Sequence, residues 1–81
     1  MTDKEVFDKV VNILAPYAKN KEALASATNE TNILKDLEVN SSRLVDIILA
    51  FEDNFNIEVA DGEADKVTTI GAAVSLIKSK I

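Results

Sequence analysis

Cysteine and histidine are both absent from the 81-residue sequence, and there are only two glycines. Without cysteine, disulfides and thiolate chemistry are excluded, so redox conditions do not restrict the compartment. Without histidine, the chain lacks the most common general base and the most common metal-ligating side chain. Two glycines are too few for a glycine-rich phosphate loop. These absences argue against an enzyme, and we expect no catalytic residues.

A calcium-binding loop is excluded by two further missing residues. Asp61, Glu63 and Asp65 have the spacing of the first three ligands of such a loop. The loop requires glycine at its sixth position and glutamate at its twelfth. Those positions are Lys66 and Ala72 in this sequence. We therefore expect no metal site.

Long hydrophobic runs are also missing. The longest uncharged stretch, residues 67–77, is too short and too polar to span a bilayer. The first residues do not have the pattern of a signal peptide. A length of 81 residues with 47% hydrophobic side chains is typical of one small globular domain. We expect a single domain over residues 1–81 that is monomeric and cytoplasmic.

Negative charge is concentrated in the middle of the chain, which carries a net charge of −5 overall. Residues 36–65 contain nine acidic side chains and one basic side chain, Arg43, whereas the remainder contains five acidic side chains and eight lysines. This distribution disfavours nucleic acid as a partner. It suits docking to a basic protein surface. A solvated face that keeps a small protein soluble has the same composition, so both interpretations stay open.

Helical periodicity begins near the N-terminus. Thr2 and Glu5 have the spacing of a capping box. The apolar residues that follow at four-residue steps are Val6, Val10 and Leu14. Pro16 should end this helix, because proline has no amide to donate. Residues 19–39 then form a long connection with polar loop residues and a few apolar positions.

The most amphipathic segment follows Asn40 and Ser41, which are both favourable N-cap residues. Its buried stripe is predicted to be Leu44, Ile47, Ile48, Phe51 and Phe55. Its outer face combines carboxylates with two aliphatic side chains: Asp46, Glu52 and Asp53 with Val45 and Leu49.

The remaining sequence predicts one short helical turn and a last helix. The turn lies within residues 58–66, and the last helix begins at Thr68 or Thr69. The apolar stripe of the last helix is Ile70, Ala73, Val74, Ile77 and Ile81. No set of segments alternates as strands of a sheet would. The expected fold class is all-α: a small helical bundle of three main helices plus one short helix, with a long first loop.

Ser41 stands where the long loop meets the amphipathic helix, and two roles are open for it. As an N-cap, its hydroxyl would accept a backbone N–H of the helix. Alternatively, an exposed hydroxyl at a helix start could hold a phosphodiester, because unpaired amides and the helix dipole favour negative charge there.

Residues 36–46, Asp-Leu-Glu-Val-Asn-Ser-Ser-Arg-Leu-Val-Asp, resemble the signature around the Asp-Ser-Leu attachment site of the acyl carrier protein family. The residues that follow, as far as Val59, resemble the second helix of that family and the turn after it. Residues 66–70 resemble the lead-in to its last helix. The resemblance covers nearly the whole chain and implies a four-helix bundle whose third helix is short.

This resemblance implies a carrier protein rather than an enzyme. Ser41 would bear a covalent 4′-phosphopantetheine arm derived from coenzyme A, and the thiol of that arm would hold acyl groups as thioesters. The implied partners are a phosphopantetheinyl transferase and acyl-loading and acyl-processing enzymes of fatty acid or lipid biosynthesis, with basic docking surfaces. The implied partner-binding residues are Val45, Asp46, Leu49, Glu52 and Asp53.

Three positions depart from the family signature. Asn40 replaces its aspartate, Ser42 replaces the following leucine, and Arg43 stands where the family usually has an acidic or polar residue. These departures indicate a specialised carrier with its own partners. The alternative interpretation is an unmodified acidic protein-interaction module that has kept the fold.

Overall fold

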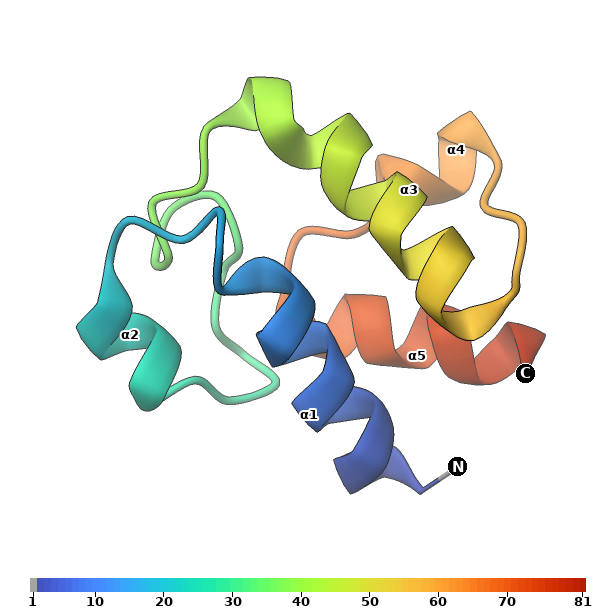
Figure 1. Cartoon of the computed structure of the whole chain (residues 1–81), viewed down its shortest axis with the longest axis horizontal. Coiled ribbons are helices and arrows are strands. Elements are labelled where there is room, and N and C mark those ends of the chain that lie inside the picture. The colour runs from blue at the N-terminus through green and yellow to red at the C-terminus, as the bar shows by residue number, and fades with distance from the viewer. Residues whose placement is uncertain (1) are drawn as a thin grey trace.

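The computed structural model describes residues 2–81, which form five α-helices and one short 3-10 helix (Figure 1). The helices in chain order are α1 (Asp3–Leu14), α2 (Lys21–Ala25), η1 (Ser41–Arg43), α3 (Leu44–Phe55), α4 (Asp61–Ala64) and α5 (Ile70–Lys80). The described residues contain no strand beyond an isolated antiparallel bridge between Asn32 and Thr69. None of their helices has the length and apolar character needed to cross a membrane. The expected all-α bundle is confirmed, and α2 adds a second short helix in the first loop.

Helix α1 begins at the capping box that the sequence predicts. The Thr2 hydroxyl accepts from the Glu5 N–H at 3.2 Å, and the Glu5 carboxylate accepts from the Thr2 N–H at 3.0 Å. Both bonds pair donors that a helix start leaves free. The bond from the Thr2 backbone, followed by that with its side chain, lowers the pKa of Glu5 below its ordinary value. The helix ends at Leu14, two residues before Pro16, where proline can no longer donate.

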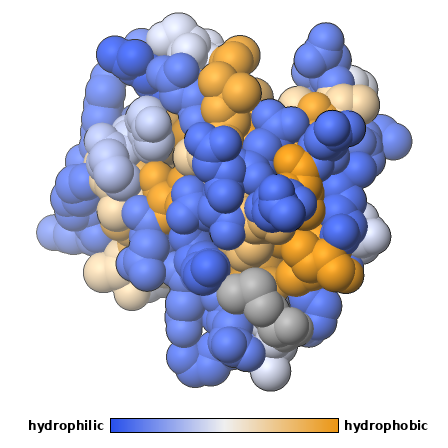
Figure 2. Space-filling model, turned by 45° about the vertical axis from the view of Figure 1, so that its right-hand side comes forward, coloured by the Kyte–Doolittle hydropathy of each residue, from blue (hydrophilic) through white to orange (hydrophobic). Residues whose placement is uncertain are grey.

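The core lies where α1 packs against α3 and α5 (Figure 1). The predicted stripe residues that are buried are Val6, Val10, Leu14, Ile47, Ile48, Phe51, Phe55, Ile70, Ala73, Val74 and Ile77. Leu44 is only half-buried. The prediction for Ile81 is wrong, because α5 ends at Lys80 and Ile81 is 50% exposed beyond its last turn. On the face drawn in Figure 2, hydrophobic side chains reach the surface in separate patches between polar ones.

The Glu63 side chain connects the short helix α4 to α5. The Glu63 carboxylate accepts from the Ala60 N–H at 3.1 Å and pairs with the Lys80 ammonium at 3.0 Å. The backbone bond first, and then Lys80, lower the pKa of Glu63 below its ordinary value of 4.5. Because the folded state favours the charged carboxylate, this contribution to stability is present above pH 4.5 and is lost as the pH falls through the lowered pKa.

The long loop between α2 and η1 is fastened to the start of α5 by its backbone. Three N–H groups donate across this contact: Ile33 to the Thr68 carbonyl at 3.0 Å, Ile70 to Thr31 at 3.1 Å and Gly71 to Asn29 at 2.8 Å. The Thr69 hydroxyl accepts from the Ala72 N–H at 3.1 Å and so caps the same helix. Ile33 and Leu37 are fully buried beneath the loop. The first turn of α5 thus has partners for donors that a helix start normally leaves free.

Glycine is required at position 71 because the loop lies against the backbone of α5 there. A Cβ atom at Gly71 would lie 2.7 Å from the Asn29 carbonyl oxygen and 3.0 Å from the Asn29 Cβ. The obstructing oxygen belongs to the backbone and cannot turn away as a side chain can. Gly62 in α4 differs, since no atom lies within 4 Å of the position that its Cβ would take.

We predict opposite effects from the same substitution at the two glycines. Gly71→Ala forces the loop away from α5 and should lower the free energy of unfolding by about 1–3 kcal/mol. Gly62→Ala removes a flexible residue from an open helical position and should raise it by about 0.5–1 kcal/mol. Thermal and urea unfolding monitored by circular dichroism measure both changes. Equal shifts in the same direction would mean that the contact between Gly71 and Asn29 contributes nothing.

Candidate functional site

The candidate site is centred on Ser41, the first residue of η1, at the point where the long loop enters α3. Its side chain is exposed to solvent. The Ser41 carbonyl accepts from the Leu44 N–H at the start of α3. Its hydroxyl has no hydrogen-bond partner among residues 2–81. The backbone of Ser41 therefore takes part in the start of α3, whereas its hydroxyl is exposed and has no partner among the described residues.

The helix cap is provided by Asn40 rather than by Ser41. The Asn40 side-chain oxygen accepts from the Ser42 N–H and from the Ser42 hydroxyl, each at 3.0 Å. The Asn40 carbonyl accepts from the Arg43 N–H at 2.9 Å. The N-cap role that position alone allowed for Ser41 is therefore wrong. Asn40 occupies the donors of Ser42 and leaves the hydroxyl of Ser41 unused.

The loop immediately before Ser41 is held at two points. The Leu37 carbonyl accepts from the N–H groups of Lys19 and Asn20 at 3.0 and 3.1 Å, and the Leu37 side chain is fully buried. Val39 is also buried. Between them Glu38 has a φ of 55°, a left-handed conformation that is costly for a residue with a side chain. This turn allows Leu37 and Val39 to be buried on either side of the exposed Glu38, and the chain reaches the surface at Asn40 and Ser41.

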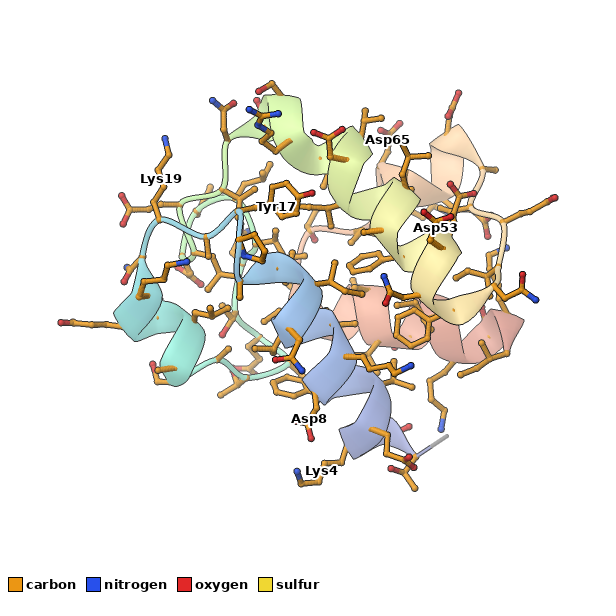
Figure 3. All side chains as sticks on the ribbon, viewed as in Figure 1. Lys4, Asp8, Tyr17, Lys19, Asp53 and Asp65 are labelled. Carbon is orange, nitrogen blue, oxygen red and sulfur yellow. The ribbon has the colours of Figure 1, made fainter. Side chains whose placement is uncertain are left out.

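The outer face of α3 presents apolar and acidic side chains together. Val45 is 68% exposed and Leu49 is 53% exposed, the largest exposures among the bulky hydrophobic residues of the described chain. Asp53 is exposed, and in Figure 3 it lies with Asp65 in the upper part of the molecule, away from Lys4 and Asp8 on α1. The prediction that this face is open is confirmed for these side chains.

Asp46 and Glu52 share this face but already have partners within the chain. Asp46 pairs with the Arg43 guanidinium at 3.3 Å. Glu52 is half-buried, and its carboxylate accepts from the Val59 N–H at 3.0 Å. Sequence periodicity did not reveal the second bond, because Val59 lies beyond the end of α3 in a loop that returns to it. Glu52 therefore positions this loop as well as adding charge to the face.

A shallow groove of about 260 Å³ separates α3 from the segment around α4. Its lining is mainly aliphatic, with carboxylates at intervals: Leu44, Val45, Ile48, Leu49, Glu52, Val59, Asp61, Ala64 and Asp65. Leu44, Val59 and Ala64 were not predicted as site residues, since their half-buried positions become neighbours only when α4 folds back. Within residues 2–81 no three acidic side chains come close enough together to hold a metal ion.

The chain is similar to known proteins in both sequence and fold. Residues 8–77 match the family described as the phosphopantetheine attachment site. The chain is 40% identical to the acyl carrier protein of Lactobacillus acidophilus over 98% of its own length and 96% of that relative. It is 36% identical to the acyl carrier protein of Picosynechococcus over 96% and 94% of the two chains. The solved structure of the acyl carrier protein from Enterococcus faecalis matches all of both chains with a TM-score of 0.82 and 34% identity.

The two neighbouring polar residues at the start of η1 should differ in their effect on stability. Asn40→Ala removes the acceptor for the Ser42 N–H and should lower the free energy of unfolding by about 1 kcal/mol. Ser41→Ala removes a hydroxyl without a partner and should change it by no more than about 0.5 kcal/mol. Chemical denaturation of both variants measures this contrast. If Ser41→Ala lowered the free energy of unfolding more than Asn40→Ala does, Ser41 rather than Asn40 would be the capping residue.

Proposed function

The chain belongs to the acyl carrier protein family, and from this premise we propose that Ser41 is the residue that carries its 4′-phosphopantetheine arm. The protein is a carrier that tethers acyl intermediates. The arm supplies a thiol that holds each acyl group as a thioester. The observation that supports Ser41 is its exposed hydroxyl, which lacks a partner among residues 2–81 and lies within residues 8–77, the segment that the family matches.

Attachment transfers the phosphopantetheine group from coenzyme A to the Ser41 hydroxyl. The Ser41 oxygen forms a new ester bond to the phosphorus next to pantetheine as its proton leaves. The anhydride P–O bond within the diphosphate of coenzyme A breaks, and adenosine 3′,5′-bisphosphate is the leaving group. Ser42 is a poorer acceptor because its hydroxyl donates to Asn40 at 3.0 Å. The chain has no histidine to take the proton, so the proposed phosphopantetheinyl transferase would provide the general base.

The outer face of α3 is the surface that we assign to partner enzymes. Val45 and Leu49 offer an exposed apolar centre, and Asp46, Glu52 and Asp53 place carboxylates around it. Surfaces that combine an apolar centre with charges of one sign bind partners of the opposite charge. The proposed partners are therefore a transferase and acyl-loading and acyl-processing enzymes whose docking surfaces are basic.

The attachment site is tested by intact mass measurement after incubation with coenzyme A and a broad-specificity phosphopantetheinyl transferase. We expect the wild-type chain and Ser42→Ala to gain the mass of one phosphopantetheine, and Ser41→Ala to gain none. Circular dichroism controls for folding of each variant. Modification of Ser41→Ala would assign the arm elsewhere. No added mass on any variant would support the unmodified protein-interaction module.

The docking face is tested by reversing one charge at a time. Asp53→Lys should reduce the kcat/KM of arm transfer by roughly 2- to 10-fold at low salt, because peripheral charges mainly increase the association rate. The reduction should shrink as salt is added, since screening acts over about 8 Å at physiological ionic strength.

The matched control for this experiment is Glu30→Lys, which makes the same charge change at an exposed loop position outside the docking face. Leu49→Ala should also reduce kcat/KM, with little dependence on salt, because it removes apolar contact. Equal effects of Asp53→Lys and Glu30→Lys would show that only net charge matters and that the face of α3 has no specific role.

A further inference from the structure

Arg43 is the one basic residue among residues 36–65, and it lies in the same helical turn as Ser41. Its side chain is 62% exposed and pairs with Asp46, which is itself 46% exposed. Ion pairs as exposed as this contribute little to folding stability. The position of the only local cation, two residues from the proposed attachment point, therefore calls for an explanation other than stability.

A phosphodiester at Ser41 would add one negative charge to the most acidic part of the chain. The backbone donors that could receive it are already used: the Ser42 N–H donates to the Asn40 side chain, and the Arg43 N–H donates to the Asn40 carbonyl. The backbone N–H groups with which a helix start usually binds an anion therefore already donate to Asn40. Within the chain, a cationic side chain is then the group that can compensate the added charge.

Arg43 has the chemistry and the reach to provide this compensation. Its guanidinium carries five N–H donors in a planar arrangement that matches two oxygens of a phosphate. One of its nitrogens contacts Asp46 at 3.3 Å, which is long for a charge-assisted hydrogen bond. Ser41 and Arg43 both lie in η1, where the rise is about 2.0 Å per residue. Their side chains leave the turn in different directions, and the flexible arginine stem has to bend across this short distance.

We infer that Arg43 is a positioning residue that changes partner when Ser41 is modified. In the unmodified chain the guanidinium pairs with Asp46. Once Ser41 bears the arm, the guanidinium moves to the phosphodiester oxygens and releases the Asp46 carboxylate to the docking face. This inference rests on the proposed attachment at Ser41. Its consequence is that the modified carrier presents one more free carboxylate beside Val45 than the unmodified chain does, so partner enzymes can distinguish the two forms.

The control cation for this inference is Lys19, an exposed residue in the segment after α1 (Figure 3). Lys19→Gln removes one positive charge from the chain without altering the turn that contains Ser41. Arg43→Gln removes the proposed phosphate partner and keeps a polar side chain. Asp46→Asn removes the partner of Arg43 in the unmodified chain and leaves a side chain of nearly the same shape.

The experiment compares modified and unmodified chains by nuclear magnetic resonance, after intact mass has established that each sample carries the arm or lacks it. The phosphorus resonance of the arm should shift measurably in Arg43→Gln relative to the wild type and should not shift in Lys19→Gln. Exchange of the Arg43 Nη protons with water, which include those that face Asp46, should slow several-fold on modification. Asp46→Asn should speed this exchange in the unmodified chain and leave it unchanged in the modified one.

An unchanged phosphorus resonance in Arg43→Gln would overturn the inference, as would an equal shift in Lys19→Gln. Continued dependence of the Arg43 Nη protons on Asp46 in the modified chain would overturn it too. If Arg43→Gln slows acyl loading while the phosphorus resonance is unchanged, Arg43 instead contacts an acidic group of the partner enzyme. A sample that never gains mass contradicts the attachment at Ser41, so the two failures are distinguishable.

Discussion

The close approach of the first loop to the start of α5 is the constraint on which the rest of the structure depends. Gly71 lets the Asn29 carbonyl come within 2.8 Å of its amide, and two further backbone bonds continue the contact. These bonds provide donors of α5 with partners and fix the path of a loop that has little regular structure. The buried side chains of Ile33 and Leu37 anchor the rest of the loop on the core, and η1 begins four residues after Leu37.

At the start of η1 the capping residue, Asn40, differs from the proposed attachment residue, Ser41. Asn40 caps the turn through the donors of Ser42, so the neighbouring Ser41 keeps an exposed hydroxyl on a fixed backbone. The attachment that we propose at Ser41 needs both properties, because partner enzymes must reach the attachment point and must find it in a constant position. The left-handed backbone at Glu38 belongs to the same arrangement, since strain of this kind is commonly retained at functional sites.

The outer face of α3 combines features that cost folding stability with features that suit the proposed docking. Val45 and Leu49 remain exposed beside a groove with acidic residues along it, although burial of both would stabilise so small a domain. Internal partners moderate the charge of this face: Glu52 accepts the Val59 amide, and Arg43 neutralises Asp46. Glu52 thus positions the loop at Val59, and both carboxylates remain near a surface that a basic partner can approach.

The sequence by itself determined the features that depend on neighbouring residues in one helix. The capping box at Thr2 follows from the spacing of two residues. The buried stripe of α1, that of α3 apart from the half-buried Leu44, and the exposure of Val45 and Leu49 follow from a period of 3.6 residues. The structure confirms these features. Only the tertiary structure decided features that join segments distant in the chain. The bond from Val59 to Glu52 and the approach of Asn29 to Gly71 have no local pattern. The exposure of Ile81 depends on where α5 ends, which the sequence pattern also missed. The choice of Asn40 over Ser41 as the cap was also beyond the sequence, because both residue types are good caps and the path of the incoming loop selects between them.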